Sequence, residues 1–437
     1  MKNTNWDQFK NEREALAYLK TLPRYTNTFL KSLFWRTNFF VHLLYCRLFK
    51  VNKPLFIVFV TNNKCNLDCT YCYGEYGKRD HYEEYTTTAL CKMIDELKEM
   101  GTTLLTLHGG ESLLRPDFGE IMNYAKLKGF YVSFNTNGYA VPQRIEEIRC
   151  ADTVCVSLDG REENNDKNRG EGCFKKAVTA IDVLTASGVP VVLSATLTRE
   201  VIEDMEYLAQ LAVEKGVRIQ YSILYNHADQ TQQENVMSTD EIRRITKKIW
   251  DLKRASYPVY YAENVLSTTF SWPLNFDRRF LMDTDEDFND LVNNNDFIPC
   301  YHGSLKFQMD ADGRVVVCWA RNDPNAPNVK DLGIKEAFKQ VEKNNHCRHC
   351  VYLANNEHNG LMSMSLKNIL RSIIIQVSDA SKIRKTKYQP CEKNRLRVVS
   401  EGLSKKDIVE EVINEVHLKN APTPNTNEKS PKKRVHS

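Results

Sequence analysis

The chain has 437 residues, of which 42% are hydrophobic and 27% are charged, a composition that excludes a fully disordered or collagen-like protein. No stretch approaches the roughly 20 apolar residues that a membrane-spanning helix needs, which excludes a polytopic membrane protein. The 60 Lys and Arg residues stand against 56 Asp and Glu residues, so the net charge is only +4 and nucleic acid is not expected as a partner.

Cysteine usage is the informative part of the composition. The thirteen cysteines are an odd number, and the sequence opens without an apolar signal segment, so we expect a reducing, cytoplasmic setting and no disulfide framework. Seven cysteines fall into two spaced groups. The other six are interpreted as small buried hydrophobes: Cys46, Cys91, Cys150, Cys155, Cys173 and Cys391.

Residues 1–53 are predicted to form a distinct N-terminal segment whose main element is a basic amphipathic helix over residues 28–50. No Asp or Glu occurs from Ala15 to Leu67, and one side of the helix is apolar. Two interpretations stay open: an interfacial helix against anionic head groups, or a helix that packs its apolar side into the protein core. The apolar side comprises Phe29, Leu30, Leu33, Phe34, Phe40, Val41, Leu44 and Leu48.

Strand and helix signals alternate over residues 54–235. Six such repeats favour an α/β fold with a parallel sheet and crossover helices, and chemistry at the carboxyl ends of the strands. The predicted strands cover residues 55–61, 103–108, 130–136, 153–158, 189–197 and 217–224. The predicted helices between them include residues 86–100, 117–127, 174–186 and 203–214.

The remaining chain is predicted in four parts. Residues 236–299 form a helical connector, and residues 300–352 carry the second cysteine group around a hairpin over residues 306–318. Residues 353–420 contain C-terminal helices, and residues 421–437 lack large apolar residues and are predicted to be disordered. The two C-terminal helices are predicted over residues 361–377 and 403–417.

The first cysteine group, Cys65, Cys69 and Cys72, follows directly on the first predicted strand. Thiolates are the usual ligands of iron–sulfur clusters, and three ligands on a four-iron cube leave one iron open to a cofactor or substrate. A zinc site would normally recruit a fourth protein ligand, and no further Cys or His lies nearby in sequence. Three clustered core cysteines or a zinc knuckle are the alternatives.

With Tyr71 before its last cysteine, this Cys-x3-Cys-x-aromatic-Cys pattern resembles the signature of the radical S-adenosylmethionine (SAM) superfamily. The resemblance covers roughly residues 54–225 and implies a partial (β/α)6 TIM-type barrel. It also implies that the three thiolates hold a [4Fe–4S] cluster whose free iron chelates SAM. An electron from a donor such as flavodoxin or ferredoxin would cleave SAM to a 5′-deoxyadenosyl radical, which abstracts a substrate hydrogen.

The resemblance also implies residues that bind SAM. Gly109, Gly110 and Glu111 match the motif that meets the SAM ammonium, because glycines permit close backbone approach and a carboxylate pairs with an amino group. The remaining implied SAM contacts are Asn137 in a turn after the third strand, Ser157 and Arg169 toward the carboxylate and ribose, and Ser194 toward the ribose. No catalytic acid, base or second hydrogen donor is assigned.

The second cysteine group has the order Cys300, Cys318, Cys347 and Cys350. Four cysteines in this order can close a tetrahedral zinc site or ligate a second cluster. The Gly-x4-Cys element at Gly313 resembles the SPASM and twitch extensions of radical SAM enzymes. No further cysteine follows until Cys391, so we expect the shorter α+β, twitch-like extension with one auxiliary [4Fe–4S] cluster.

The resemblance implies an oxidoreductase-type radical SAM enzyme of unknown substrate. The basic apolar segment before the barrel favours a lipid or membrane-linked small molecule and peripheral contact with the inner membrane face through residues 28–50. The alternative enzymes are a ribosomal-peptide maturase and a sugar or aminocyclitol dehydrogenase. A non-enzymatic iron–sulfur or zinc scaffold is the contrasting alternative.

Overall fold

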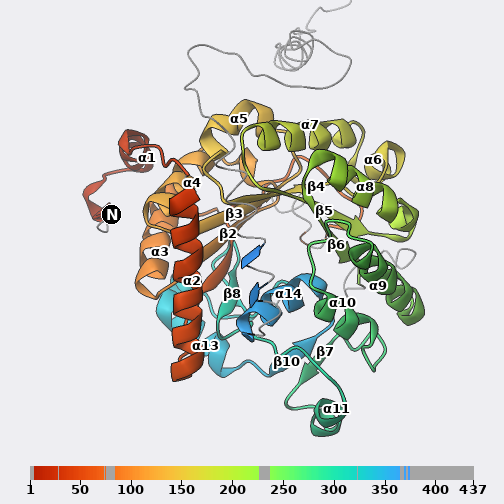
Figure 1. Cartoon of the computed structure of the whole chain (residues 1–437). Coiled ribbons are helices and arrows are strands. Elements are labelled where there is room, and N and C mark those ends of the chain that lie inside the picture. Colours follow the sequence, from red (N-terminus) through yellow and green to blue (C-terminus); the bar gives the residue numbers. More distant parts are fainter. Residues whose placement is uncertain are drawn as a thin grey trace, which may run out of the picture. The chain divides into compact units, whose positions relative to one another are not determined.

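The central feature of the structure is a run of six parallel strands in the order β6-β5-β4-β3-β2-β1 (Figure 1). The computed structural model describes residues 4–27, 29–72, 74, 84–225, 237–321, 323–364, 369–370 and 373–374. The strands are β1 (Phe56–Val60), β2 (Leu104–His108), β3 (Tyr131–Thr136), β4 (Thr153–Ser157), β5 (Val191–Leu197) and β6 (Arg218–Ile223). This architecture confirms the predicted α/β fold with a partial (β/α)6 barrel.

Helices connect the strands and cover the outer side of the sheet (Figure 1). They are α3 (Thr87–Glu99), α4 (Phe118–Leu127), α5 (Val141–Ile148), α6 (Glu162–Arg169), α7 (Cys173–Ala186) and α8 (Met205–Lys215), with 3-10 turns η3 (Ser112–Leu114) and η4 (Arg199–Asp204). The short helices α5 and α6 escaped prediction, because α6 is almost entirely polar and α5 is only eight residues long.

Strands β2 to β6 have one apolar and one more polar face, as the two-residue period of a strand allows, whereas β1 is apolar on both faces. Leu105 and Leu107 belong to the main core under the helices. The residue between them, Thr106, lies on the other face and forms a hydrogen bond of 2.9 Å with Ser133. On the same face, Gln220 Nε2 donates to Ser194 Oγ at 2.8 Å. The barrel interior is therefore lined largely by polar side chains of β2 to β6.

The hairpin predicted over residues 306–318 is present as β8 (Lys306–Met309) and β9 (Val315–Val316), paired antiparallel. Strand β8 also pairs in parallel with β1, with Phe56 opposite Lys306, so the main sheet has eight strands. The turn requires a glycine, because Gly313 has a φ of +97° and a Cβ there would lie 2.3 Å from Tyr85 Oη. The predicted domain boundaries stay predictions. The eight-stranded sheet contains strands from both sides of the predicted boundary at residue 300.

The rest of the described C-terminal part is mostly helical. Its elements are α9 (Thr239–Arg254), α10 (Glu263–Phe270), β7 (Phe280–Met282), α11 (Phe288–Asn294), α12 (Val329–Leu332), α13 (Ile334–Lys343), β10 (Cys347–Cys350) and α14 (Leu353–Met362), with β10 and β7 forming a separate antiparallel pair. His358 of α14 packs against Phe56, the first residue of β1, so α14 covers the end of the barrel where the strands begin. The predicted helix over residues 361–377 lies mostly outside the described residues, and residues 403–417 and 421–437 lie wholly outside them.

The N-terminal segment contains η1 (Trp6–Gln8), α1 (Glu12–Thr21) and α2 (Phe29–Phe49). Helix α2 confirms the predicted helix over residues 28–50. Its Phe39, Leu43 and Cys46 are buried against a small cluster with Leu55, Phe56, Leu305 and Met362. Trp35 covers Gly129, where a Cβ would lie 2.1 Å from the indole ring. Helix α2 therefore crosses the loops that lead into the strands.

Most of the side of α2 that was predicted to be apolar faces outward. Leu30 is 75% exposed, Phe34 61%, Val41 58% and Leu48 68%. The inward contacts are made by Trp35, Phe39, Leu43 and Cys46, with Phe40 joining from the predicted apolar side. Helix α2 therefore packs on the barrel, as the second interpretation expected, but mainly through other side chains than the predicted ones. Among the described residues, no helix has both the length and the apolar character needed to span a membrane.

A buried ion pair joins α4 to the start of β4 and generates the first testable prediction. Lys126 Nζ lies 2.5 Å from Asp152 Oδ2, and neither side chain is exposed. Replacing Lys126 with Met leaves the Asp152 carboxylate buried without its counter-charge, which we expect to lower the free energy of unfolding by about 3–5 kcal/mol. The measurement is chemical denaturation followed by fluorescence.

The matched control is Lys247→Met at the exposed Lys247–Asp251 pair of α9, whose atoms are 2.6 Å apart. Exposed pairs contribute about 0–1 kcal/mol, so this variant should unfold like the parent protein. Equal destabilisation by the two substitutions would contradict the role assigned to the buried pair.

Candidate functional site

The first cysteine group lies on the loop that follows β1, at the carboxyl end of the barrel. Cys65 and Cys72 pack against Val60 at the end of β1 and against Ala311 of the hairpin turn. The loop is fixed by a hydrogen bond from Thr70 N to Asn168 O at 3.1 Å. The structure thus brings the predicted thiols together beside the tip of the β8–β9 hairpin.

Burial affects the pKa of two thiols of this loop, Cys65 and Cys69. Burial raises the pKa of Cys65 to about 11 and that of Cys69 to about 12. The nearby Arg169 guanidinium acts in the opposite direction on the pKa of Cys69. Ligation by a metal requires the thiolate form, so binding must displace the thiol protons.

Arg169 is held close to the cysteine loop by a buried carboxylate. Its Nε and Nη2 donate to Asp159 Oδ2 and Oδ1 at 2.8 and 2.9 Å. Asp159 also accepts from the Tyr71 hydroxyl and, at 2.9 Å, from Thr196 N. Arg169 thus already has a bidentate partner within the protein, and its assignment to the SAM carboxylate stays a proposal.

Glu111 lies at the end of β2 and organises the neighbouring turn. Its carboxylate accepts from Leu113 N at 3.1 Å, Thr136 Oγ1 at 2.9 Å and Asn137 N at 2.7 Å. Burial raises the pKa of Glu111, and these three hydrogen bonds oppose that effect. Asn137 Nδ2 in turn donates to Asn66 Oδ1 of the cysteine loop at 2.8 Å, so β2, β3 and the cysteine loop form one hydrogen-bonded unit.

The two glycines before Glu111 sit against the loop after β1. A Cβ on Gly109 would lie 1.8 Å from Asn62 Oδ1, which explains the need for glycine. Gly110 N donates to Asn62 O at 3.3 Å. The carbonyl oxygen of the Asn62 side chain is buried and has no hydrogen-bond partner in the described part of the protein.

Ser157 and Ser194 are partners in the register of β4 and β5, where the two strands approach their carboxyl ends. Both side chains are partly buried, and they alternate along their strands with Val156 and Leu193, which face the outer core. The structure therefore places both predicted residues on the inner face of the barrel.

The second cysteine group assembles below the barrel, from three separate segments. Cys300 precedes β8, Cys318 follows β9, and Cys347 and Cys350 begin and end β10. A hydrogen bond between the thiols of Cys300 and Cys347 lowers the pKa of Cys300 and raises that of Cys347. Burial raises the pKa of Cys318 to about 11 and holds that of Cys350 well above its usual range.

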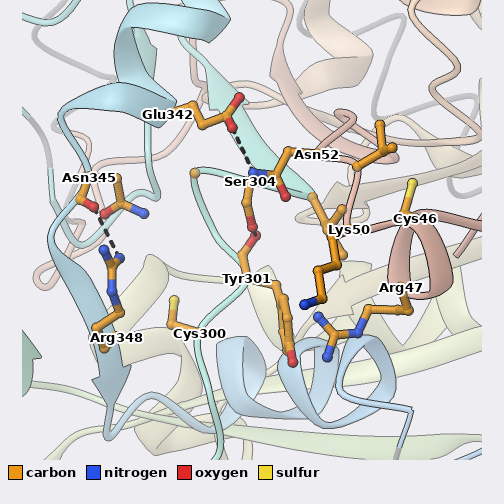
Figure 2. A pocket seen from close by; sticks show the side chains of 13 residues that line it. Cys46, Arg47, Lys50, Asn52, Cys300, Tyr301, Ser304, Glu342, Asn345 and Arg348 are labelled. Atoms are coloured by element: carbon orange, nitrogen blue, oxygen red, sulfur yellow. Dashed lines mark hydrogen bonds between the residues drawn. The ribbon is translucent and has the colours of Figure 1, made fainter.

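Cys300 also lines a cavity of about 400 Å³ that reaches the end of α2 (Figure 2). Arg47 and Lys50 extend from α2 toward Tyr301 on one side of this cavity, and Arg348 lies on the other side. The Arg47 guanidinium stacks 4.7 Å from the centroid of the Tyr301 ring. The second cysteine group therefore has a basic opening toward α2.

Both cysteine groups have the donor chemistry of iron–sulfur ligands. The first offers three thiols beside a guanidinium, and the second offers four thiols that influence one another electrostatically. Within the described ranges, no three Cys, His, Asp or Glu side chains converge on a point where a single metal ion could bind.

Some residues around the two sites were missed by sequence reasoning. Asp159 directly follows β4, a position that could have identified it, but its partner Arg169 was assigned to the cofactor alone. Lys306, His108 and His358 come from three separate elements, so only the parallel pairing of β8 with β1 brings them together. No local pattern contains that information.

Comparison with known proteins places residues 59–212 in the Radical SAM superfamily. The mycofactocin maturase MftC of Mycobacterium tuberculosis is 36% identical over 180 residues, which cover 40% of this chain and 46% of the relative. The AdoMet-dependent heme synthase of Methanosarcina barkeri is 29% identical over 210 residues, which cover 47% of this chain and 60% of the relative. The matches thus span about half the length of each relative.

The fold is also similar to a solved structure, that of SuiB from Streptococcus suis. The TM-score is 0.53 at 15% sequence identity, and the match covers 76% of this chain and 77% of SuiB. At this identity the similarity concerns the fold alone. It extends well beyond residues 59–212.

The Asp159–Arg169 fork predicts how the first cysteine loop responds to a substitution. Asp159→Asn removes the carboxylate charge and leaves the buried Arg169 guanidinium uncompensated, which we expect to displace the loop through Tyr71. After anaerobic reconstitution, this variant should retain about four fewer irons per chain than the parent protein.

A matched control is Asp182→Asn at the half-exposed Lys215–Asp182 pair, whose atoms are 2.7 Å apart. This variant should retain iron like the parent, because the pair lies outside the site and contributes little. Full iron retention by Asp159→Asn would show that the fork does not hold the loop.

Proposed function

We propose that this chain, whose residues 59–212 match the Radical SAM superfamily, is a radical SAM enzyme with an auxiliary-cluster extension that cleaves SAM reductively and abstracts a hydrogen atom from a substrate. The observation that carries the proposal is the meeting of three thiols with the Glu111 turn and the Arg169 guanidinium at the carboxyl end of the barrel. When bound, the cluster and SAM would supply one electron and a carbon-centred radical.

Residues of this chain would bind the first cluster and SAM. We assign Cys65, Cys69 and Cys72 as ligands of the first cluster. Glu111 fixes the turn at Asn137, and the narrow fit of Gly109 against Asn62 brings backbone close to the loop. The remaining proposed SAM contacts are Gly110, Asn137, Ser157, Arg169 and Ser194.

We assign the four thiols of the second group to one auxiliary [4Fe–4S] cluster. Three of these cysteines, Cys318, Cys347 and Cys350, are buried, and Cys300 is partly exposed at the cavity near α2. A structural zinc site at this position is the rival assignment, and metal analysis separates the two.

Metal content and turnover test the proposed activity. Anaerobically reconstituted protein should hold about eight irons per chain, and it should form 5′-deoxyadenosine from SAM and a strong reductant. Cys69→Ala should abolish this product and remove about half of the iron, because two thiolates do not retain the cluster.

The matched control is Cys91→Ala in α3, a buried cysteine in the core outside both groups. It should retain iron and product formation. Stoichiometric zinc without iron, or full SAM cleavage by Cys69→Ala, would contradict the assignment.

We further propose that α2 places the protein on an anionic membrane surface. Eight of the fourteen large apolar side chains that are exposed in the described part of the chain belong to α2. No acidic residue occurs between Ala15 and Leu67, so the charges on this helix and on the segments that flank it in sequence are all positive. An apolar stripe flanked by basic residues is the pattern of an interfacial helix.

The substrate that this surface favours is a lipid or another membrane-linked small molecule. Arg47 and Lys50 extend from α2 into the cavity that reaches Cys300, which suits an anionic head group near the second site. The first cysteine loop lies at the opposite end of the barrel from α2, so membrane contact would leave that loop accessible to an electron donor such as flavodoxin or ferredoxin.

Peptide maturation is the second candidate, and the names of the relatives favour it. The matches include a mycofactocin maturase and a PqqA peptide cyclase, the latter 28% identical over 173 residues. These matches lie in less than half of this chain, so the substrate class of the relatives is carried over only as an alternative.

Flotation with vesicles tests the membrane assignment. Phe34→Ser combined with Leu48→Ser removes two exposed apolar side chains of α2 and should weaken binding to phosphatidylglycerol-containing vesicles by about tenfold or more. Binding of the parent protein should also weaken as salt is raised, since salt screens the basic residues.

The control pair is Val213→Ser with Leu332→Ser, two exposed apolar side chains on other helices, 50% and 39% exposed. These substitutions should leave flotation unchanged. If the α2 double variant floats like the parent protein, α2 is not a membrane-binding helix.

A further inference from the structure

Lys306 is a buried lysine at the first position of β8, between the second cysteine group and the barrel interior. Its residue is only 5% exposed, and it pairs in register with Phe56 of β1. The ammonium lies 4.5 Å from the centroid of the Phe56 ring and 2.9 Å from Nδ1 of His358. Both contacts hold the charged end of the side chain below the barrel.

The two other most buried lysines of the described chain show what such a side chain normally needs. Lys126 is paired with Asp152 at 2.5 Å, and Lys128 is paired with Asp95 at 2.6 Å. A buried ammonium without a negative partner is costly, because it loses its hydration without electrostatic compensation. These two pairs follow that rule.

Lys306 has no such carboxylate among the residues that the structure describes. Its backbone turns back on the segment that begins at Cys300, since Lys306 N donates to Tyr301 O at 3.1 Å and Gly303 N donates to Lys306 O at 2.7 Å. On its other sides lie His108, His302 and His358, and Lys306 lowers the pKa of each of them. Burial is the largest effect and lowers the pKa of Lys306 to about 7. The segment that carries Cys300 therefore lies beside this lysine.

We propose that the Lys306 ammonium is the counter-charge of the auxiliary cluster and raises the reduction potential of that cluster. The inference rests on the auxiliary cluster assigned under the proposed function. One-electron reduction adds a negative charge to a cluster, so a fixed positive charge nearby stabilises the reduced form more than the oxidised form. His358 accepts a hydrogen bond from the ammonium and positions it, while the ring itself stays neutral.

Lys306 also lies between the two sites. Lys306 lowers the pKa of His108, which ends β2 directly before Gly109 and Gly110, and it forms a backbone bridge with His302, two residues after Cys300. A single buried charge thus lies between the thiols of the second group and the polar interior of the barrel. The charge would affect the auxiliary cluster more than the first, because the first cysteine loop lies at the far end of the strands.

The test is an anaerobic potentiometric titration followed by electron paramagnetic resonance. The full chain carries alanine at Cys65, Cys69 and Cys72, so that the auxiliary cluster alone gives the signal. Lys306→Met, a substitution of similar length without the charge, should lower the equilibrium constant for one-electron reduction about tenfold, which corresponds to about 59 mV. Lys306→Arg should keep the potential near that of the parent.

His358→Gln is the second variant, and it keeps the lysine while changing its hydrogen-bond partner. It should shift the potential in the same direction as Lys306→Met but by less. This variant keeps the inference testable if Lys306→Met fails to retain iron. A potential that is unchanged in Lys306→Met and in His358→Gln, with about four irons still bound, would overturn the inference.

The failure of the inference is distinguishable from the failure of the proposed function. If the parent protein binds zinc at the second group, no cluster signal appears and the auxiliary cluster assignment itself is wrong. If the cluster is present and its potential is insensitive to both variants, only the role of Lys306 is wrong. Lys339→Met on the exposed side of α13 is the control for a distant loss of positive charge and should leave the potential unchanged.

Discussion

The parallel pairing of β1 with two strands, β2 and β8, is the constraint on which the arrangement of both sites depends. At its carboxyl end, β1 leads into the first cysteine loop. Its neighbour β2 is followed by Glu111, which lies beside that loop. At its amino end, Phe56 pairs with Lys306, which fixes the hairpin and the second cysteine group below the barrel. One five-residue strand therefore sets the separation between the two groups of thiols.

Buried cations have different partners in the barrel and at the second cysteine group. In the barrel, the buried cations Lys126 and Arg169 each bind an aspartate of the protein. At the second cysteine group, Lys306 has no carboxylate partner in the described part of the chain, and its ammonium binds Nδ1 of His358 at 2.9 Å instead. The charges of Lys126 and Arg169 are compensated within the fold, whereas the charge of Lys306 would be compensated by a ligand of the second cysteine group. This difference supports the interpretation of the second group as a functional site.

The barrel strands were predictable from sequence because each is a short run of β-branched and apolar residues between helices of regular period. The three cysteines after β1 and the hairpin around Gly313 were predictable for a similar reason, since their signals are local. The parallel contact of β8 with β1 joins residues 250 positions apart, and no local pattern encodes it. Helix α2 shows a different limit: it has two apolar sides, and periodicity alone does not indicate which one packs, so its exposed stripe became evident only in the folded protein.

The central claim is that the open side of the first cluster binds SAM, and spectroscopy of anaerobically purified, reduced protein tests it most directly. Electron paramagnetic resonance should show signals from two clusters, and addition of SAM should change only the signal that is lost when Cys69 is replaced by alanine. A spectrum that SAM leaves unchanged, with all irons of the first cluster already bound by protein side chains, would contradict the account.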